Sequence, residues 1–455
     1  MNVYIPSTDN ELEEMRQAAG IASAEEMFAV IPPELRLTEL PEMPPALTEL
    51  ELVKELKNLA AQNTVAAERP CFLGCGAYDH YIPTAVHHIS SRQEFYTSYT
   101  PYQPELSQGT LQAIFEFQSY ITRLTGLDIA NSSMYDGASA AAEAALMAVR
   151  ATGNTLIYMS DAVPPQYQLT IRTYVEAQGF EVRNLPLAAD GTTVIDVSTD
   201  LDEAAAILVA SPNYYGIVED LESLAERAHA DDALMVAACD PLAMAILKPP
   251  GLCSVDIAVG ETQPFGMPLS FGGPYAGYLA TTEKLLRRMP GRIVGETVDR
   301  DGRRTFVLTM QAREQHIRRE KATSNICTNQ ALCATIATIH LSLMGQKGIV
   351  TAATLTAQNA CLLSELLQAK GLGSLLYDGP FFREFAFRLN LPDQDVARLN
   401  RWLDAKGFTG GYDLSRDNPE LAGVCLFAVT EKRTRAEIEQ LVDLIADYCQ
   451  SGGDI

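Results

Sequence analysis

The sequence predicts an α/β protein with one large domain built on a mixed, largely parallel sheet and a smaller α+β domain at the carboxyl end. From about Tyr120 to Tyr278, short β-rich apolar runs alternate with helical segments, which is typical of strands joined by helical crossovers. Single hydrophobic cores stop growing at roughly 250 to 300 residues, and this chain has 455. We therefore expect more than one domain.

Residues 1–65 are predicted to form a helical arm. Two helices are announced by capping boxes, in which a hydroxyl and a carboxylate three residues later bind free backbone amides. Gly20 ends the first helix and the Pro32-Pro33 pair ends the second, and a third is expected at 46–62. The two capping boxes are Thr8 with Glu11 and Ser23 with Glu26.

Residues 66–345 are expected to form the large domain. Its apolar runs are short and bounded by turn residues, as strands of a buried sheet are. The expected strands are 155–159, 180–185, 206–210, 234–238, 257–261 and 275–280, with helices at 137–149, 165–178 and 219–230.

Residues 346–455 are expected to form the small α+β domain. In its last helix four apolar residues fall on one face, and Thr434 with Glu437 makes another capping box. The apolar residues are Ile438, Leu441, Val442 and Ile445. The expected helices are 350–370, 393–406 and 435–448, and the expected strands are 382–389 and 424–429.

The composition excludes two classes of protein. A formal net charge of −24 would repel a phosphate backbone, so a nucleic-acid binder is not expected. No apolar run approaches the roughly 18 residues of a membrane span. The first residues lack a basic and an apolar leader region, so we expect a cytoplasmic protein.

The cysteines and one basic segment give two further expectations. Nine cysteines are scattered without a CxxC pair, which favours reduced thiols and no metal site. Between Lys284 and Lys321, eleven Lys/Arg face five Asp/Glu, a net of +6. This segment is predicted to meet an anion or a partner, with a solvated basic face as the open alternative.

Asp240 ends the apolar run from Leu234 and is the first candidate site residue. Ligands of open α/β sheets gather at the carboxyl ends of strands, where this acid is expected. A role as a helix cap or turn former is the open alternative.

Six longer segments carry a family resemblance. They include GETQPFGMPLSFGGPYAGYL at 260–279 and YTSYTPYQPELSQGTLQAIFEFQ at 96–118, and the other four are 4–15, 72–83, 134–148 and 311–332. Together they resemble the P-protein of the glycine cleavage system over nearly the whole chain. That family is built either as one long chain or as two shorter homologous chains, and this length fits the N-terminal half, the subunit 1 type.

The resemblance implies a fold, an activity and partners. The fold would be that of pyridoxal-phosphate-dependent transferases of fold type I, which is aminotransferase-like. The chain would assemble with a subunit 2 that binds pyridoxal phosphate. The complex would decarboxylate glycine and transfer the aminomethyl group to the lipoyl arm of H-protein.

The resemblance also indicates that this chain has lost its own cofactor site. Subunit 2 carries its lysine in a His-Lys-Thr-Phe turn, and matching the phenylalanines places Gln263 where the lysine should be. An amide cannot form an imine with the cofactor aldehyde. Asp240 matches the aspartate that would hold the pyridinium nitrogen. Asp136, as N-cap of the helix that begins at Gly137, would occupy the amides that bind phosphate.

The segment 96–108 is predicted to be an extended aromatic loop, because its two prolines disfavour helix. In fold type I dimers each active site borrows residues from the partner, so this loop is expected to complete the site of subunit 2. The candidates are Thr97, Ser98, Tyr99 and Tyr102. Tyrosines that merely fill the chain's own surface are the alternative.

The roles of other polar residues, and two rival functions, are left as alternatives. We expect a structural role for three histidines. For a basic cluster we expect either a subunit contact or a place along the path to the active site. No residue is expected to be catalytic in this chain alone; the rivals are a self-sufficient fold type I enzyme and a non-catalytic scaffold. The residues concerned are His80, His87, His88, Arg313, Arg318, Arg319, Lys321, Thr323, Ser324 and Asn325.

Overall fold

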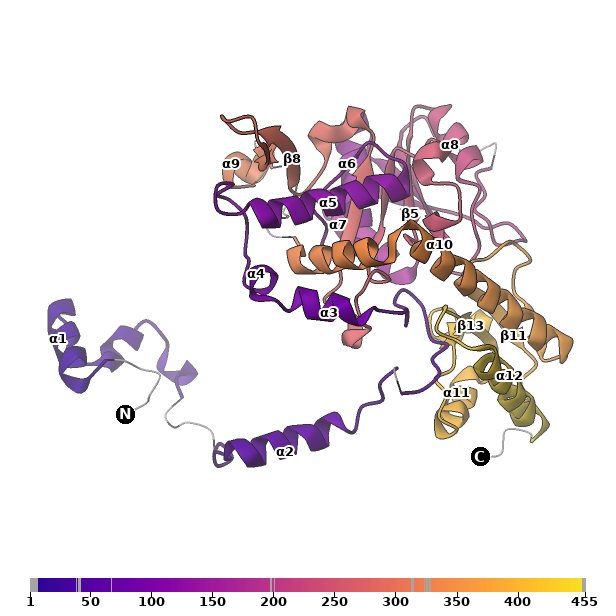
Figure 1. The fold of residues 1–455 in the computed structure, drawn as a ribbon, viewed down its shortest axis with the longest axis horizontal. Helices are drawn as coiled ribbons and strands as arrows, with labels where there is room; N and C mark the ends of the chain where they lie inside the picture. The colour runs from indigo at the N-terminus through magenta and orange to yellow at the C-terminus, as the bar shows by residue number, and fades with distance from the viewer. Residues whose placement is uncertain are drawn as a thin grey trace. The chain divides into compact units, whose positions relative to one another are not determined.

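The computed structural model divides the chain into two compact units, Met1–Thr64 and Val65–Ile455. The residues that it describes are 7–37, 39, 42–66, 68–196, 199, 201–311, 315–322, 324, 326 and 329–451. Figure 1 shows the order of the elements along the chain.

The N-terminal unit contains two α-helices within its described residues. α1 (Asp9–Ala19) begins at the expected capping box of Thr8 and ends at Gly20, whose φ is 69°. α2 (Glu49–Ala60) begins at a further capping box, Thr48 with Glu51, and so starts later than expected. The capping box at Ser23 was wrong: Ala24–Phe28 is a short 3-10 helix, and within the described residues Ser23 makes no side-chain cap bond. The Glu26 carboxylate instead accepts the Ala22 N–H at 2.6 Å.

The described residues of the second unit form a seven-stranded sheet of order β1-β7-β6-β5-β4-β2-β3. β2, β3, β4, β5 and β6 run parallel to one another, and β7 lies antiparallel between β6 and β1. The six expected strands are confirmed, and β1 was missed because two residues give no periodic pattern. The bounds are β1 Ile129–Ala130, β2 Leu156–Ser160, β3 Glu181–Leu185, β4 Ala204–Ser211, β5 Leu234–Cys239, β6 Ile257–Glu261 and β7 Gly277–Thr281.

Helices cover both faces of this sheet. Alternate residues of β4 point to opposite faces, so Ile207 and Val209 join the core with α5, α8 and α10, whereas Ala206 and Leu208 join α6 and α7. Figure 1 shows α5 and the first half of α10 over the near face. The bounds are α5 Gln108–Thr125, α6 Gly137–Thr152, α7 Pro165–Glu176, α8 Leu221–His229 and α10 Ala331–Ala369.

A two-stranded antiparallel hairpin lies beyond this sheet, in the basic segment. β8 (Ile293–Val298) pairs with β9 (Arg304–Thr309), and α5 packs on both strands. We did not anticipate this hairpin from the sequence, because its charged residues obscure the alternation. Three short α-helices also lie in the described residues of this part: α3 Thr84–Ser90, α4 Gln93–Tyr96 and α9 Gln315–Arg318.

The C-terminal part contains, within the described residues, a four-stranded antiparallel sheet of order β10-β11-β13-β12. The four apolar residues predicted for one face of the last helix are all buried, and its capping box is confirmed. Phe72, from near the start of the unit's sequence, is buried in the same hydrophobic core as these residues. The bounds are β10 Gly373–Leu375, β11 Glu384–Leu389, β12 Tyr412–Asp413, β13 Val424–Ala428, α11 Val396–Ala405 and α12 Arg435–Gln450.

α10 joins the large and small parts and is longer than the expected helix 350–370. Its backbone is non-helical at Gly345, with φ 60° and ψ 179°. The kink falls where we placed the boundary between the domains 66–345 and 346–455, and that boundary stays a prediction. Among the described residues, no helix is long and apolar enough to span a bilayer.

Candidate functional site

A cavity of about 400 Å³ lies at the carboxyl ends of β4, β5 and β6. Asp240 lines it, as predicted from the end of β5, together with Arg383 from the C-terminal part of the unit. A contiguous hollow of about 60 Å³ shares Tyr78, Asp240 and Arg383 and adds Glu384. The polar and aromatic residues that line the larger cavity include Cys75, Tyr78, Tyr167, Asp240, Glu261, Tyr275 and Arg383.

Gln263 lies directly after β6 and is 1% exposed. Its Nε2 donates to the carbonyls of Tyr78 at 2.9 Å and Met267 at 2.8 Å. Its Oε1 accepts the Tyr78 N–H at 3.0 Å. Both amide hydrogens and the amide oxygen are thus used to hold two backbone segments together, as burial of an amide requires.

The N-terminus of α6 is occupied by carboxylates of the chain itself. Asp136 is the N-cap, as predicted, and accepts the Ser139 N–H at 2.7 Å. Glu261 accepts the Gly137 N–H at 3.0 Å through one oxygen and the Ala276 N–H at 3.1 Å through the other. Burial, with the nearby charge of Asp136, raises the pKa of Glu261 to about 7.

Tyr167 of α7 covers the same helix end. A Cβ added to Gly137 would lie 1.8 Å from the Tyr167 hydroxyl, so the two residues are in close contact and a larger residue at 137 would displace the tyrosine. Burial raises the pKa of Tyr167 well above its ordinary value, so the phenol stays neutral. The helix end is therefore filled by a phenol and two acids.

Asp240 is paired with Arg383, which lies just before β11. One oxygen of Asp240 accepts the Leu242 and Ala243 N–H groups at 2.9 Å each, and the other oxygen pairs with the guanidinium. The turn-forming role weighed from the sequence is therefore present, and the role of holding a pyridinium nitrogen stays a prediction. The guanidinium carbon also lies 3.3 Å from the centre of the Tyr78 ring.

The same guanidinium fixes the charge of His80. Arg383 Nη1 lies 2.8 Å from His80 Nε2, and an arginine can only donate, so Nε2 accepts. His80 is therefore neutral with its proton on Nδ1, which lies 2.7 Å from the Glu431 carboxylate. Burial lowers the pKa of His80, in agreement with this tautomer. Glu431 accepts further bonds from Tyr81 and Thr356.

The candidates in the aromatic loop lie elsewhere. None of 97–102 is among the described residues that line the cavity. Tyr99 is 77% exposed, whereas Tyr102 is 52% exposed and accepts a hydrogen bond from Arg292 at 2.9 Å. The Thr97 and Ser98 hydroxyls donate to carbonyls of α4.

The remaining candidates are dispersed. His87 and His88 are exposed on α3, and Arg318, Arg319 and Lys321 are exposed near α9. Ser324 donates to the buried Glu143 at 2.8 Å. Arg313, Thr323 and Asn325 lie outside the described residues.

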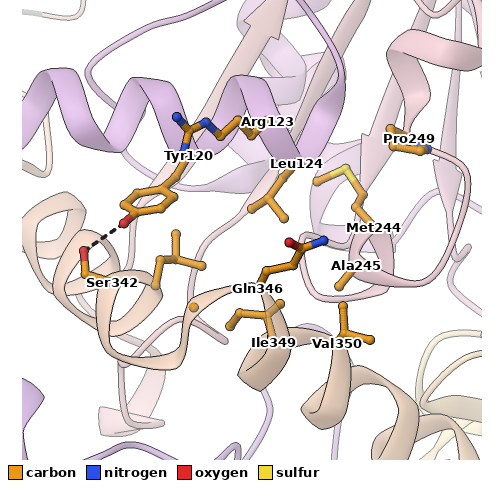
Figure 2. A pocket seen from close by; sticks show the side chains of 12 residues that line it. Tyr120, Arg123, Leu124, Met244, Ala245, Pro249, Ser342, Gln346, Ile349 and Val350 are labelled. Carbon is orange, nitrogen blue, oxygen red and sulfur yellow. Dashed lines mark hydrogen bonds between the residues drawn. The ribbon is translucent and has the colours of Figure 1, made fainter.

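A larger cavity of about 580 Å³ lies between α5 and the kink of α10. Figure 2 shows its apolar side chains and the bond of 3.0 Å between the hydroxyls of Tyr120 and Ser342. Among the described residues that line it there is no carboxylate, histidine, lysine or cysteine. It therefore lacks the acid and base groups that would support chemistry.

Glu261, Tyr167 and Arg383 were missed as site residues. Glu261 directly precedes the turn that contains Gln263, so its place at a strand end was a usable signal. Arg383 reaches Asp240 from 143 positions along the chain (383 − 240), and no local pattern announces such a contact.

Known proteins with the same fold define the class of this chain. It superposes on a sphingosine-1-phosphate lyase of Burkholderia pseudomallei with a TM-score of 0.64 over 91% of this chain and 93% of that one, at 16% identity. Such likeness shows the fold alone, and the fold is that of pyridoxal-phosphate-dependent transferases of fold type I, as expected.

Closer relatives define the family. The family model for the glycine cleavage system P-protein matches residues 2–445. A probable glycine dehydrogenase (decarboxylating) subunit 1 of Desulforamulus reducens is 50% identical over 96% of this chain and 98% of its own length, and that of Anoxybacillus flavithermus 47% over 98% and 99%. An inhibitor-bound glycine decarboxylase (P-protein) has a TM-score of 0.88 at 42% identity, covering 98% of this chain and 99% of that one. The chain belongs to the P-protein family, which confirms the resemblance.

Proposed function

We propose that this chain is the subunit of a two-chain glycine decarboxylase that does not bind the cofactor, and that its partner subunit binds it. The names of the relatives support a subunit 1 of a glycine-decarboxylating enzyme. The partner would be the homologous subunit 2, which would bind pyridoxal phosphate and act on glycine. The aminomethyl group would pass to the lipoyl arm of H-protein, and the assembly would work in the cytoplasm.

One observation carries the division of labour: Gln263 stands at the turn after β6 with its amide engaged in three hydrogen bonds. An amide forms no imine with an aldehyde. The described residues that line the cavity include no lysine. Lys248 pairs with Glu222 on the surface, and Lys284 is exposed.

The rest of the cavity does not fit pyridoxal phosphate either. A phosphate needs free amides and a positive environment at a helix N-terminus. Here the Gly137 and Ser139 amides of α6 are bound by Glu261 and Asp136, and the charge of Asp136 would repel a phosphate. Asp240, which would face a pyridinium nitrogen, already pairs with Arg383.

The aromatic loop is proposed to be the contribution of this chain to the partner's active site. Tyr99 is strongly exposed, and a tyrosine combines a rigid apolar body with a polar tip. Residues of this type are typical of interfaces.

Spectroscopy of separate and mixed subunits tests the proposal. The purified chain, incubated with pyridoxal phosphate and passed over a desalting column, should show no visible cofactor band and no glycine decarboxylation. The mixture with subunit 2 should co-purify, show the band and be active. A stable band on the isolated chain would contradict the proposal and favour the self-sufficient enzyme. Full activity of subunit 2 alone would favour the scaffold.

A further inference from the structure

The aromatic loop and the β8–β9 hairpin are joined at the carboxyl end of the loop. Gln108, the first residue of α5, donates through Nε2 to the carbonyls of Pro104 and Phe306, both at 2.8 Å. Its Oε1 accepts the Phe306 N–H at 2.9 Å and the Thr305 hydroxyl at 2.7 Å. One side chain therefore ties the end of the loop to β9.

Arg292 makes the second connection, at the start of the hairpin. Its side chain reaches the middle of the loop: Nη2 donates to the Tyr102 hydroxyl at 2.9 Å and Nη1 lies 3.5 Å from Thr100 Oγ1. The guanidinium carbon lies 5.2 Å from the centre of the Tyr102 ring, within the range of a cation–π interaction.

The backbone of Arg292 is held at the edge of the protein core. Its carbonyl accepts the Ser132 N–H at 2.9 Å, and the next residue, Ile293, is buried against the sheet. Arg292 is 5% exposed. The backbone of Arg292 is therefore fixed by residues outside the loop, and its side chain extends from there to the loop.

The aromatic loop contributes few side chains to the core of its own chain. Tyr96, Tyr99 and Leu106 are 68%, 77% and 83% exposed. Burying a guanidinium is unfavourable unless its partners compensate, so holding an otherwise exposed loop with a buried arginine points to a requirement on where the loop's exposed tyrosines lie.

We propose that Arg292 is a positioning residue that fixes the aromatic loop on the hairpin and so sets where Tyr99 meets the partner's active site. The inference rests on the proposed function, in which this loop completes that site. A planar fork reaches the Tyr102 and Thr100 oxygens at once, whereas a lysine ammonium offers a single point charge.

Hydrogen exchange of the assembled enzyme tests the anchor independently of activity. In Arg292→Lys and in Tyr102→Phe, amides of 97–107 should exchange at least threefold faster than in the wild type, with assembly and Tm unchanged. Arg303→Lys, an exposed arginine of the same hairpin, is the matched control and should leave exchange unaltered.

Kinetics on the same variants test the role of the anchor. We expect kcat for glycine decarboxylation to fall about tenfold in each single variant, with KM for glycine unchanged, and the double variant to be no worse than the singles, because both remove one interaction. Unchanged exchange in both singles, or faster exchange with unchanged kcat, would overturn the inference. An inactive wild-type mixture would instead refute the proposed function.

Discussion

The side-chain amide of Gln263 forms two hydrogen bonds with the backbone of Tyr78. It accepts the Tyr78 N–H at 3.0 Å and donates to the Tyr78 carbonyl at 2.9 Å. The residue that stands in place of the expected lysine is therefore a structural link between β6 and the segment that carries Tyr78 and His80.

Because of this link, we expect Gln263→Lys to destabilise the chain and not to restore cofactor binding. The lysine would leave the buried Tyr78 N–H without an acceptor and bury an ammonium, at about 3 kcal/mol or more. We expect a lower denaturant midpoint and no cofactor band. Gln112→Lys, on the exposed face of α5, is the control and should be neutral. A stable variant that takes up the cofactor would show that only the amine is missing.

Glu261 predicts a pH dependence of stability. Its pKa of about 7 in the folded chain lies above the ordinary value of 4.5, so the folded state holds this proton more tightly than the unfolded state. The stabilisation is full below pH 4.5 and is lost as pH rises through 7, by on the order of 3 kcal/mol. The Tm of Glu261→Gln minus that of the wild type should increase from pH 5.5 to 8. A constant difference would show that Glu261 titrates normally.

Tyr99→Phe tests the exposed tip of the aromatic loop. Loss of one hydroxyl contact at an active site is expected to reduce turnover by the assembled enzyme about tenfold, while co-purification with the partner is unchanged. Tyr81→Phe removes the hydroxyl of an exposed tyrosine outside the loop and serves as the control. Wild-type turnover in Tyr99→Phe would assign this tyrosine to the surface of its own chain.

The basic segment predicts salt-sensitive docking of H-protein. Arg287 and Arg288 are exposed, and attraction between exposed charges is screened over about 8 Å at physiological ionic strength. Binding should weaken as salt rises and weaken about tenfold when both are reversed to Glu, whereas reversal of Arg435 on α12 should have little effect. Salt-independent binding would exclude docking at this segment.

Several arginines of the basic segment are buried or paired and do not add to its exposed positive charge. Arg292 is buried against Tyr102, Arg304 pairs with Glu296 and Arg300 with Asp301. The positive surplus of the segment is therefore not carried by the hairpin, which explains why a charge count along the sequence overstates the exposed basic patch.

The elements of the fold were largely predictable because their signals are local. The expected strands 257–261 and 234–238 match β6 and β5, and the capping boxes at Thr8 and Thr434 are present. Glu26 failed as part of a capping box because its carboxylate turned to the Ala22 amide. Local patterns do not decide between two nearby donors.

The site was only partly predictable, because its contacts are long-range. The end of a predicted strand pointed to Asp240, and the family resemblance pointed to Asp136 and Gln263. Neither identified Arg383, which pairs with Asp240 from the C-terminal part of the unit, or Arg292, which holds Tyr102 from the residue before β8. Such pairs depend on how separate parts of the chain fold together.

Borohydride reduction of the assembled enzyme, followed by peptide mapping of both chains, tests the central claim most directly. With Gln263 buried in backbone hydrogen bonds and the helix end occupied by Glu261, we predict a reduced pyridoxyl group on the lysine of the partner chain and none on this chain. A pyridoxyl group at stoichiometric yield on any lysine of this chain would contradict the account.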